Sequence, residues 1–177
     1  MLDALITSKT RIKLLVKFFL NSSSESYLRN LEEEFGESTN AIRVELNKFE
    51  LAGLLNSRTA GNKKLFRANT HHPLFPEIHN LLLKHLGFDQ IIEKVVNKLG
   101  DVKQVFLVGK FAKGIDTEII DIIFMGDEIN KNYLIDLVEK TEKLIKRKVR
   151  YLVFTPKEMR QYLAQKPSTD FLLLWEK

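Results

Sequence analysis

The sequence predicts an α+β protein in two parts: a helical first part that carries one β-hairpin, and a second part in which strands alternate with helices. In the first half, apolar residues recur at helical spacing in three successive segments, and a short turn joins the second segment to the third. In the second half, β-branched apolar runs of strand length alternate with amphipathic segments. That alternation is typical of a sheet packed against helices, and here it indicates a small α/β domain with a mixed sheet.

The first part begins with two helices. Ser8 is a candidate N-cap for a helix through "SKTRIKLLVKFFL", whose apolar residues Ile12, Leu15 and Phe19 recur at helical spacing. After the polar break "NSSSES", the segment "SYLRNLEEEFG" predicts a second helix that ends at Gly36.

A third, longer helix is predicted for "NAIRVELNKFELAGLL", with Ser38 or Thr39 as its cap. Ile42, Leu46, Phe49 and Leu54 would face inward. Two helices joined by so short a turn, with a glycine before it, indicate a helix-turn-helix.

A basic-tipped hairpin follows in "LLNSRTAGNKKLFRAN", where Gly61 and Asn62 supply the turn chemistry. This hairpin is the wing of a winged helix-turn-helix. "THHPLFPEIHN" then predicts a rigid link, and Pro76 lies in the first turn of the next helix. We expect a winged-helix domain over residues 1–72, a linker and helix over 73–87, and an α/β domain over 88–177.

In the α/β domain, strands are predicted for "VKQVFLVGKFA", "EIIDIIFMGD" and "VRYLVFT". Amphipathic helices are predicted for "FDQIIEKVVNKLGD", "NKNYLIDLVEKTEKLIKRK" and "PKEMRQYLAQ". The segment "FLLLW" after Asp170 is too apolar for a free tail, so it either completes the core or contributes to a dimer contact.

The amino-acid composition excludes several classes of site and of partner. The 177 residues contain no cysteine, which excludes disulfides, thiolate zinc sites and cysteine nucleophiles. No apolar run approaches membrane-spanning length and no secretory signal is evident, so we expect a cytoplasmic protein without a membrane partner. The formal charge is +5, and its excess is concentrated between Asn40 and His72, where six Lys or Arg face two Glu.

These features predict double-stranded DNA as a partner, with the third helix in the major groove. Arg can pair bidentately with guanine and Asn with adenine, while Lys and further Arg contact phosphates. The residues expected near base edges are Thr39, Asn40, Arg43 and Asn47. Those expected on phosphates are Lys48, Arg58, Lys63, Lys64 and Arg67.

The order of these features resembles the winged-helix regulators of the ArsR and MarR type. The matching stretches are "YLRNLEEEFGESTNAIRVELNKFELAGLLNSR", "GNKKLFRAN" and "HPLF". The resemblance covers roughly the first half of the chain and implies a sequence-specific transcriptional regulator that binds DNA as a symmetric homodimer. The alternative left open is a module that binds only protein.

His71, His72, His79 and His85 cluster in the linker region, but with few carboxylates and no cysteine nearby we expect neither a metal nor a cofactor.

The stretch "VFLVGKFAKGIDTEIIDIIFMGD", residues 105–127, resembles the nucleotidyltransferase superfamily. In that superfamily a Gly-Ser pair approaches the nucleotide phosphates, and carboxylates from two strands hold divalent metals. By this resemblance Gly109 keeps the glycine position, but Lys110 replaces the serine and Ile119 the first aspartate. Asp121 keeps the second aspartate, and the third strand offers no carboxylate.

The resemblance therefore implies a degenerate site with no catalytic residues. One carboxylate cannot hold two Mg²⁺, and Lys110 could either neutralise Asp121 or contact a phosphate directly. Binding of a phosphorylated small-molecule effector at Gly109, Lys110, Gly114 and Asp121 stays open. The domain would then serve dimerisation, ligand sensing or partner binding. Two alternatives remain: an active nucleotidyltransferase recruited to nucleic acid, and an interaction module of a toxin–antitoxin-like pair.

Overall fold

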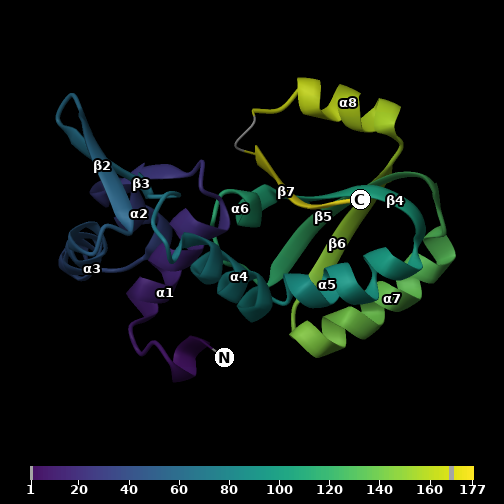
Figure 1. The fold of residues 1–177 in the computed structure, drawn as a ribbon, viewed down its shortest axis with the longest axis horizontal. Coiled ribbons are helices and arrows are strands. Elements are labelled where there is room, and N and C mark those ends of the chain that lie inside the picture. The colour runs from purple at the N-terminus through teal and green to yellow at the C-terminus, as the bar shows by residue number, and fades with distance from the viewer. Residues whose placement is uncertain (1, 168–169) are drawn as a thin grey trace. The chain divides into compact units, whose positions relative to one another are not determined.

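A computed structural model describes residues 2–167 and 170–177. It divides into two compact units, residues 1–85 and 86–177 (Figure 1). The predicted fold class is confirmed: the chain is α+β, with a winged helix-turn-helix first and a small α/β unit with a mixed sheet second. Among the described residues, no helix is both long enough and apolar enough to cross a membrane.

The helices of the first unit form where the apolar spacing predicts them. After a 3₁₀ turn, η1 (Leu2–Ala4), come α1 (Lys9–Leu15), a π-helical continuation η2 (Val16–Leu20), α2 (Leu28–Phe35), α3 (Thr39–Leu51) and α4 (Phe75–Leu86). Their inward faces bury a core that includes Phe18, Phe19, Leu31, Ile42 and Leu46.

Capping fixes the ends of these helices. The Ser8 hydroxyl accepts a hydrogen bond from the Arg11 amide, and the Ser38 hydroxyl accepts one from the Ala41 amide. Gly36 ends α2 in the left-handed region, at φ 63°. The third helix ends at Leu51, before the predicted "AGLL", because the left-handed Gly53 turns the chain into the next strand.

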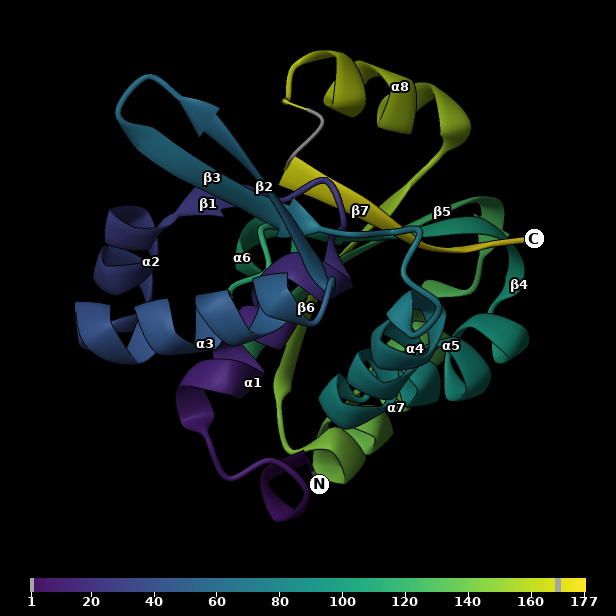
Figure 2. The same ribbon diagram turned by 60° about the vertical axis from the view of Figure 1, so that its left-hand side comes forward.

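The wing belongs to a three-stranded antiparallel sheet, β1 (Glu25–Tyr27), β2 (Leu55–Ala60) and β3 (Lys63–Ala68), in the order β1-β3-β2. Ala60 pairs with Lys63, so Gly61 and Asn62 form a two-residue turn. The sequence does not predict β1, which spans the end of the polar segment "NSSSES" and the first residues of the segment predicted as the second helix. Figure 2 shows the hairpin of β2 and β3 extending beyond α2 and α3.

The second unit contains α5 (Phe88–Lys94), the 3₁₀ turn η3 (Val96–Lys98), β4 (Gly100–Val108) and α6 (Gly109–Ala112). They are followed by β5 (Ile119–Ile129), α7 (Lys131–Ile145), β6 (Lys148–Phe154), α8 (Pro156–Ala164) and β7 (Phe171–Glu176). The sheet order is β6-β5-β4-β7. Strands β5 and β6 are parallel and the other pairs are antiparallel.

Helices cover both faces of this sheet. On one side lie α5 and α7, and on the other lies α8 (Figure 1). Met159 of α8 packs against Phe106, Ile123 and Met125, which alternate with the buried residues of the opposite face. The apolar C-terminal segment forms β7, which pairs with β4 along its length.

Candidate nucleic-acid interface and carboxylate site

A hollow in the first unit lies between α2, the exposed face of α3 and the wing. Five of the nine predicted DNA contacts line it: Thr39, Arg43, Asn47, Lys63 and Lys64. Arg29 and Asn62, which are not among the predicted DNA contacts, line it as well. Arg29 lies on α2, and the packing of α2 against α3 brings it to the hollow, which spacing within α2 alone does not predict.

Two of the cations in this hollow already have partners within the unit. The Lys63 ammonium lies over the Tyr27 ring, 4.3 Å from the ring centroid. The Lys64 ammonium is 2.7 Å from a carboxylate oxygen of Glu50 on α3. Hydrogen bonds from Lys64 and then Ser57 hold the pKa of Glu50 below its ordinary value. Glu50 and a phosphate would therefore compete for the charge of Lys64.

Arg58 and Arg67 line a different hollow, together with Glu25. Arg58 is bound to Glu25 through two hydrogen bonds of 2.7 and 2.6 Å. The hydrogen bond from Arg58 is the main reason why the pKa of Glu25 is lowered. The structure thus separates these two arginines from the five predicted contacts that line the hollow beside α3.

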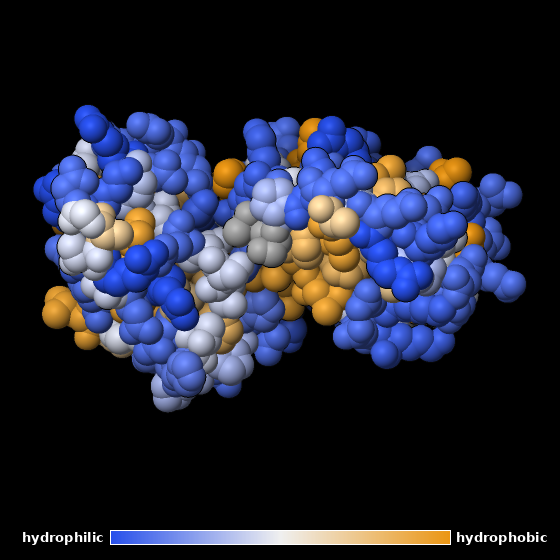
Figure 3. Space-filling model, turned by 90° about the horizontal axis from the view of Figure 1, so that it is seen from above, coloured by the Kyte–Doolittle hydropathy of each residue, from blue (hydrophilic) through white to orange (hydrophobic). Residues whose placement is uncertain are grey.

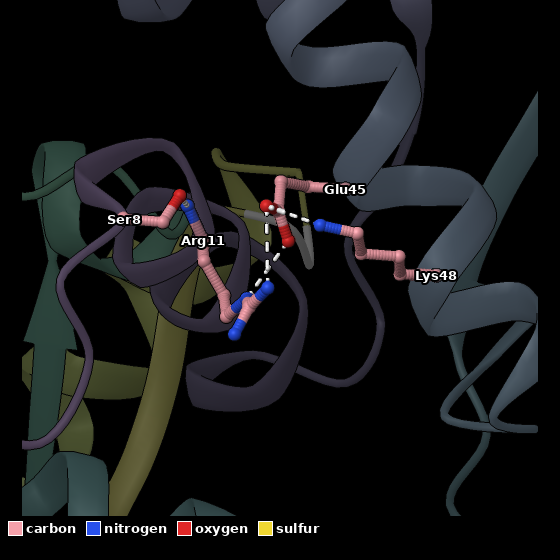
Figure 4. A network of polar contacts seen from close by, with 4 residues as sticks. All are labelled: Ser8, Arg11, Glu45 and Lys48. Carbon is pink, nitrogen blue, oxygen red and sulfur yellow. Dashed lines mark hydrogen bonds and ion pairs between the residues drawn. The ribbon is translucent and has the colours of Figure 1, made fainter.

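Lys48 belongs to a polar network that joins α3 to α1 (Figure 4). Its ammonium is 3.3 Å from Glu45, whose carboxylate also accepts hydrogen bonds of 2.8 and 3.3 Å from Arg11. Glu45 is buried, and the hydrogen bond from Arg11 is the largest cause of its lowered pKa. Asn40 is exposed in the first turn of α3.

In the second unit, strand register brings the Asp121 carboxylate next to a cation. Asp121 on β5 lies opposite Val108 on β4 and opposite Arg150 on β6. The Arg150 guanidinium donates two hydrogen bonds to the Asp121 carboxylate, of 2.6 and 2.9 Å. Neutralising Asp121, one of the two roles open to Lys110, falls instead to Arg150, 29 residues away in the sequence. Lys110 is exposed on α6.

The backbone of Gly109 lies against the Asp121 carboxylate. It has φ 68°, and a Cβ added there would lie 2.8 Å from an Asp121 carboxylate oxygen, so the position requires glycine. Gly114 lies after the four-residue α6, and its amide is bonded to the Phe111 carbonyl. Val108, Gly109, Asp121 and Arg150 line a shallow hollow that Tyr162 of α8 closes on one side, and neither Lys110 nor Gly114 lines it.

The positions next to Asp121 also carry no carboxylate. Ile119, which shares a face of β5 with Asp121, is 40% exposed and lies opposite Lys148 on β6. Within residues 2–167 and 170–177, no group of three or more His, Asp or Glu lies close enough together to hold a metal ion. His79 contacts the Phe19 carbonyl, and His85 accepts a hydrogen bond from the Leu2 amide.

No protein-family model matches the sequence, and no curated protein is significantly similar to it. Several solved structures are similar to about half of the chain. One is of a toxin–antitoxin pair, MntA-HpeT (19% identity, 51% of this chain, 72% of that chain, TM-score 0.40). Another is a candidate nucleotidyltransferase from Sulfolobus solfataricus (25% identity, 55% and 83% covered, TM-score 0.35). A third is an ArsR-like transcriptional regulator from Rhodococcus sp. RHA1 (21% identity, 55% and 86% covered, TM-score 0.34).

Proposed function

We propose that this chain is a sequence-specific regulator of transcription that binds double-stranded DNA through its winged helix, residues 1–72. The observation that carries the proposal is the hollow beside α3, where Arg43 and Asn47 lie exposed between Arg29 on α2 and Lys63 at the wing. Arginine and asparagine are the side chains that read guanine and adenine edges, and the flanking cations suit phosphates.

The second unit, in this proposal, does not transfer nucleotides. The ion pair between Asp121 and Arg150 supports this part, because a metal ion at Asp121 would have to displace a bidentate guanidinium. On β6, next to the positions of Ile119 and Asp121, Lys148 and Arg150 are each ion-paired with a carboxylate, Lys148 with Glu142 and Arg150 with Asp121. We assign to this unit dimerisation, with ligand sensing and partner binding as further roles to be tested.

The test is a selection of randomised DNA duplexes by the purified full chain, followed by binding titrations with the selected sequence. The change Arg43→Ala should lower the discrimination against a single mismatched base pair by about 1–3 kcal/mol, as expected for loss of a bidentate base contact. Lys84→Ala is the matched control, since Lys84 is an exposed cation on α4 outside the hollow. Enrichment of no sequence, or equal effects of the two changes, would contradict the proposal.

A further inference from the structure

The side of α3 that points away from the core combines amide side chains with an apolar one. Because successive residues of an α-helix are rotated by about 100°, Asn40, Val44 and Asn47 lie on one side of it, and we call these three the outer face of α3. Ile42 and Phe49, which are buried, lie on the opposite side. On the face of the molecule drawn in Figure 3, the surface of this unit is largely hydrophilic. Val44 is nevertheless 43% exposed, and the base contacts proposed above leave it without a role.

Cations border the outer face on both sides. On one side, Arg43 lines the hollow together with Arg29 of α2 and Lys63 of the wing. On the other side lies Lys48, which is exposed and 3.3 Å from Glu45. In a DNA duplex, charged phosphates border the major groove, and the base edges between them are uncharged. An uncharged face between two cationic sides therefore complements the charge pattern of that groove.

We propose that Val44 contacts the C5 methyl group of a thymine in the major groove. That methyl group is what base edges offer to an apolar side chain there, and it distinguishes thymine from cytosine. Asn40 and Asn47, on either side of Val44, carry the amide group that pairs with adenine N6 and N7. The two asparagines are about 10 Å apart along the helix axis, or about three base steps of 3.4 Å. The outer face thus matches a short run of A·T pairs, in which adenines meet the amides and a thymine meets Val44.

Leu51 provides a matched control, because it is a second exposed apolar residue on this side of α3. It is 89% exposed and is the last residue of the helix. In a helix-turn-helix, the N-terminal residues of the second helix contact the base edges. Leu51 lies about 10 Å beyond Val44 along the axis, so we expect it to lie clear of the bases.

The inference rests on the proposed function and deepens it, so its test begins with the duplex that the selection enriches. Each thymine of that duplex is replaced in turn by uracil, which lacks only the C5 methyl group. For the wild-type chain, replacement of the contacted thymine should weaken binding about fourfold, the effect of one buried group of methylene size. Val44→Ala should bind the thymine and uracil duplexes equally, whereas Leu51→Ala should keep the wild-type difference.

Both variants should fold, because both side chains are exposed and alanine has a higher helix propensity than valine or leucine. The uracil series on the wild-type chain needs no variant at all. Sequence-specific binding that is indifferent to uracil at every position would overturn this inference and leave the proposed function intact, whereas enrichment of no sequence would overturn both. A thymine preference that survives Val44→Ala would overturn the inference too. So would a change in the mass of the DNA-free chain on Val44→Ala, measured by sedimentation, since it would place a protein on the outer face.

Discussion

Under the proposed function, Glu50 would compete with DNA for a cation of the wing. Because its carboxylate holds Lys64, removing the charge should free that ammonium for a phosphate and should also remove a like charge from the interface. We expect Glu50→Gln to tighten duplex binding by up to about fivefold, the equivalent of one exposed ion pair. Titrations of labelled duplex at low salt would measure it. Glu77→Gln is the control, since Glu77 is exposed on α4, and equal affinities for the two variants would refute the competition.

Glu45 provides a pH-dependent link between α1 and α3. Its pKa is lowered by Arg11, so its contribution to stability is fully present above the pKa of the unfolded state and is lost as pH falls through the lower folded value. Glu45→Gln should lower the free energy of unfolding by about 1–2 kcal/mol at neutral pH. The difference from wild type should vanish in acid. Urea denaturation followed by far-UV circular dichroism would show this, and a difference that grows in acid would contradict it.

At the scale of elements, the wing is expected to contribute to affinity for every duplex sequence alike. Replacing Lys63 and Lys64 by alanine should reduce the slope of log affinity against log salt by about 1–2, since each phosphate contact contributes about 0.9. Unlike Arg43→Ala, this change should leave the ranking of sequences unaltered. Titrations at several salt concentrations on the selected and on a scrambled duplex provide the measurement. An unchanged slope would place the wing away from DNA.

Elements defined by local spacing could be predicted from the sequence, and those defined by a distant partner could not. The helices around Leu31 and Ile42 and the turn at Gly61 follow from periodicity, caps and turn chemistry, which act within a few residues. Strand β1 exists because Glu25 to Tyr27 pair with β3, about 40 residues on, and its own sequence is polar. The ion pair of Arg150 with Asp121 could not be predicted for the same reason, because only the register of β5 and β6 brings the two residues together.

At the scale of the whole molecule, one unit has a hollow lined by cations, and the other has the Asp121 carboxylate, which is ion-paired with Arg150. Incubation with labelled nucleoside triphosphates, Mg²⁺ or Mn²⁺ and cell extract should give no metal-dependent transfer. Metal-dependent labelling that disappears in Asp121→Asn would show an active enzyme.

The proposal that Asp121 holds no metal ion can also be tested by adding carboxylates beside it. Ile119→Asp combined with Arg150→Glu places two further carboxylates next to Asp121 on the same face of β5 and β6. We expect this double variant to bind Mn²⁺ measurably by calorimetry, and the neutral pair Ile119→Asn with Arg150→Gln not to bind it. Equal binding by both variants would mean that the charge of this edge does not control metal affinity.

The pairing of β4 with β7 also has a consequence for how the chain is made. Gln104 and Glu176 are register partners although 72 residues separate them, whereas the first unit closes its core and its sheet within residues 1–85. Contacts so distant in sequence form slowly and cannot form at all until the later strand has left the ribosome. The winged helix can therefore fold while the second unit is still being synthesised, and for that interval β4 has an unpaired apolar edge that a chaperone can recognise.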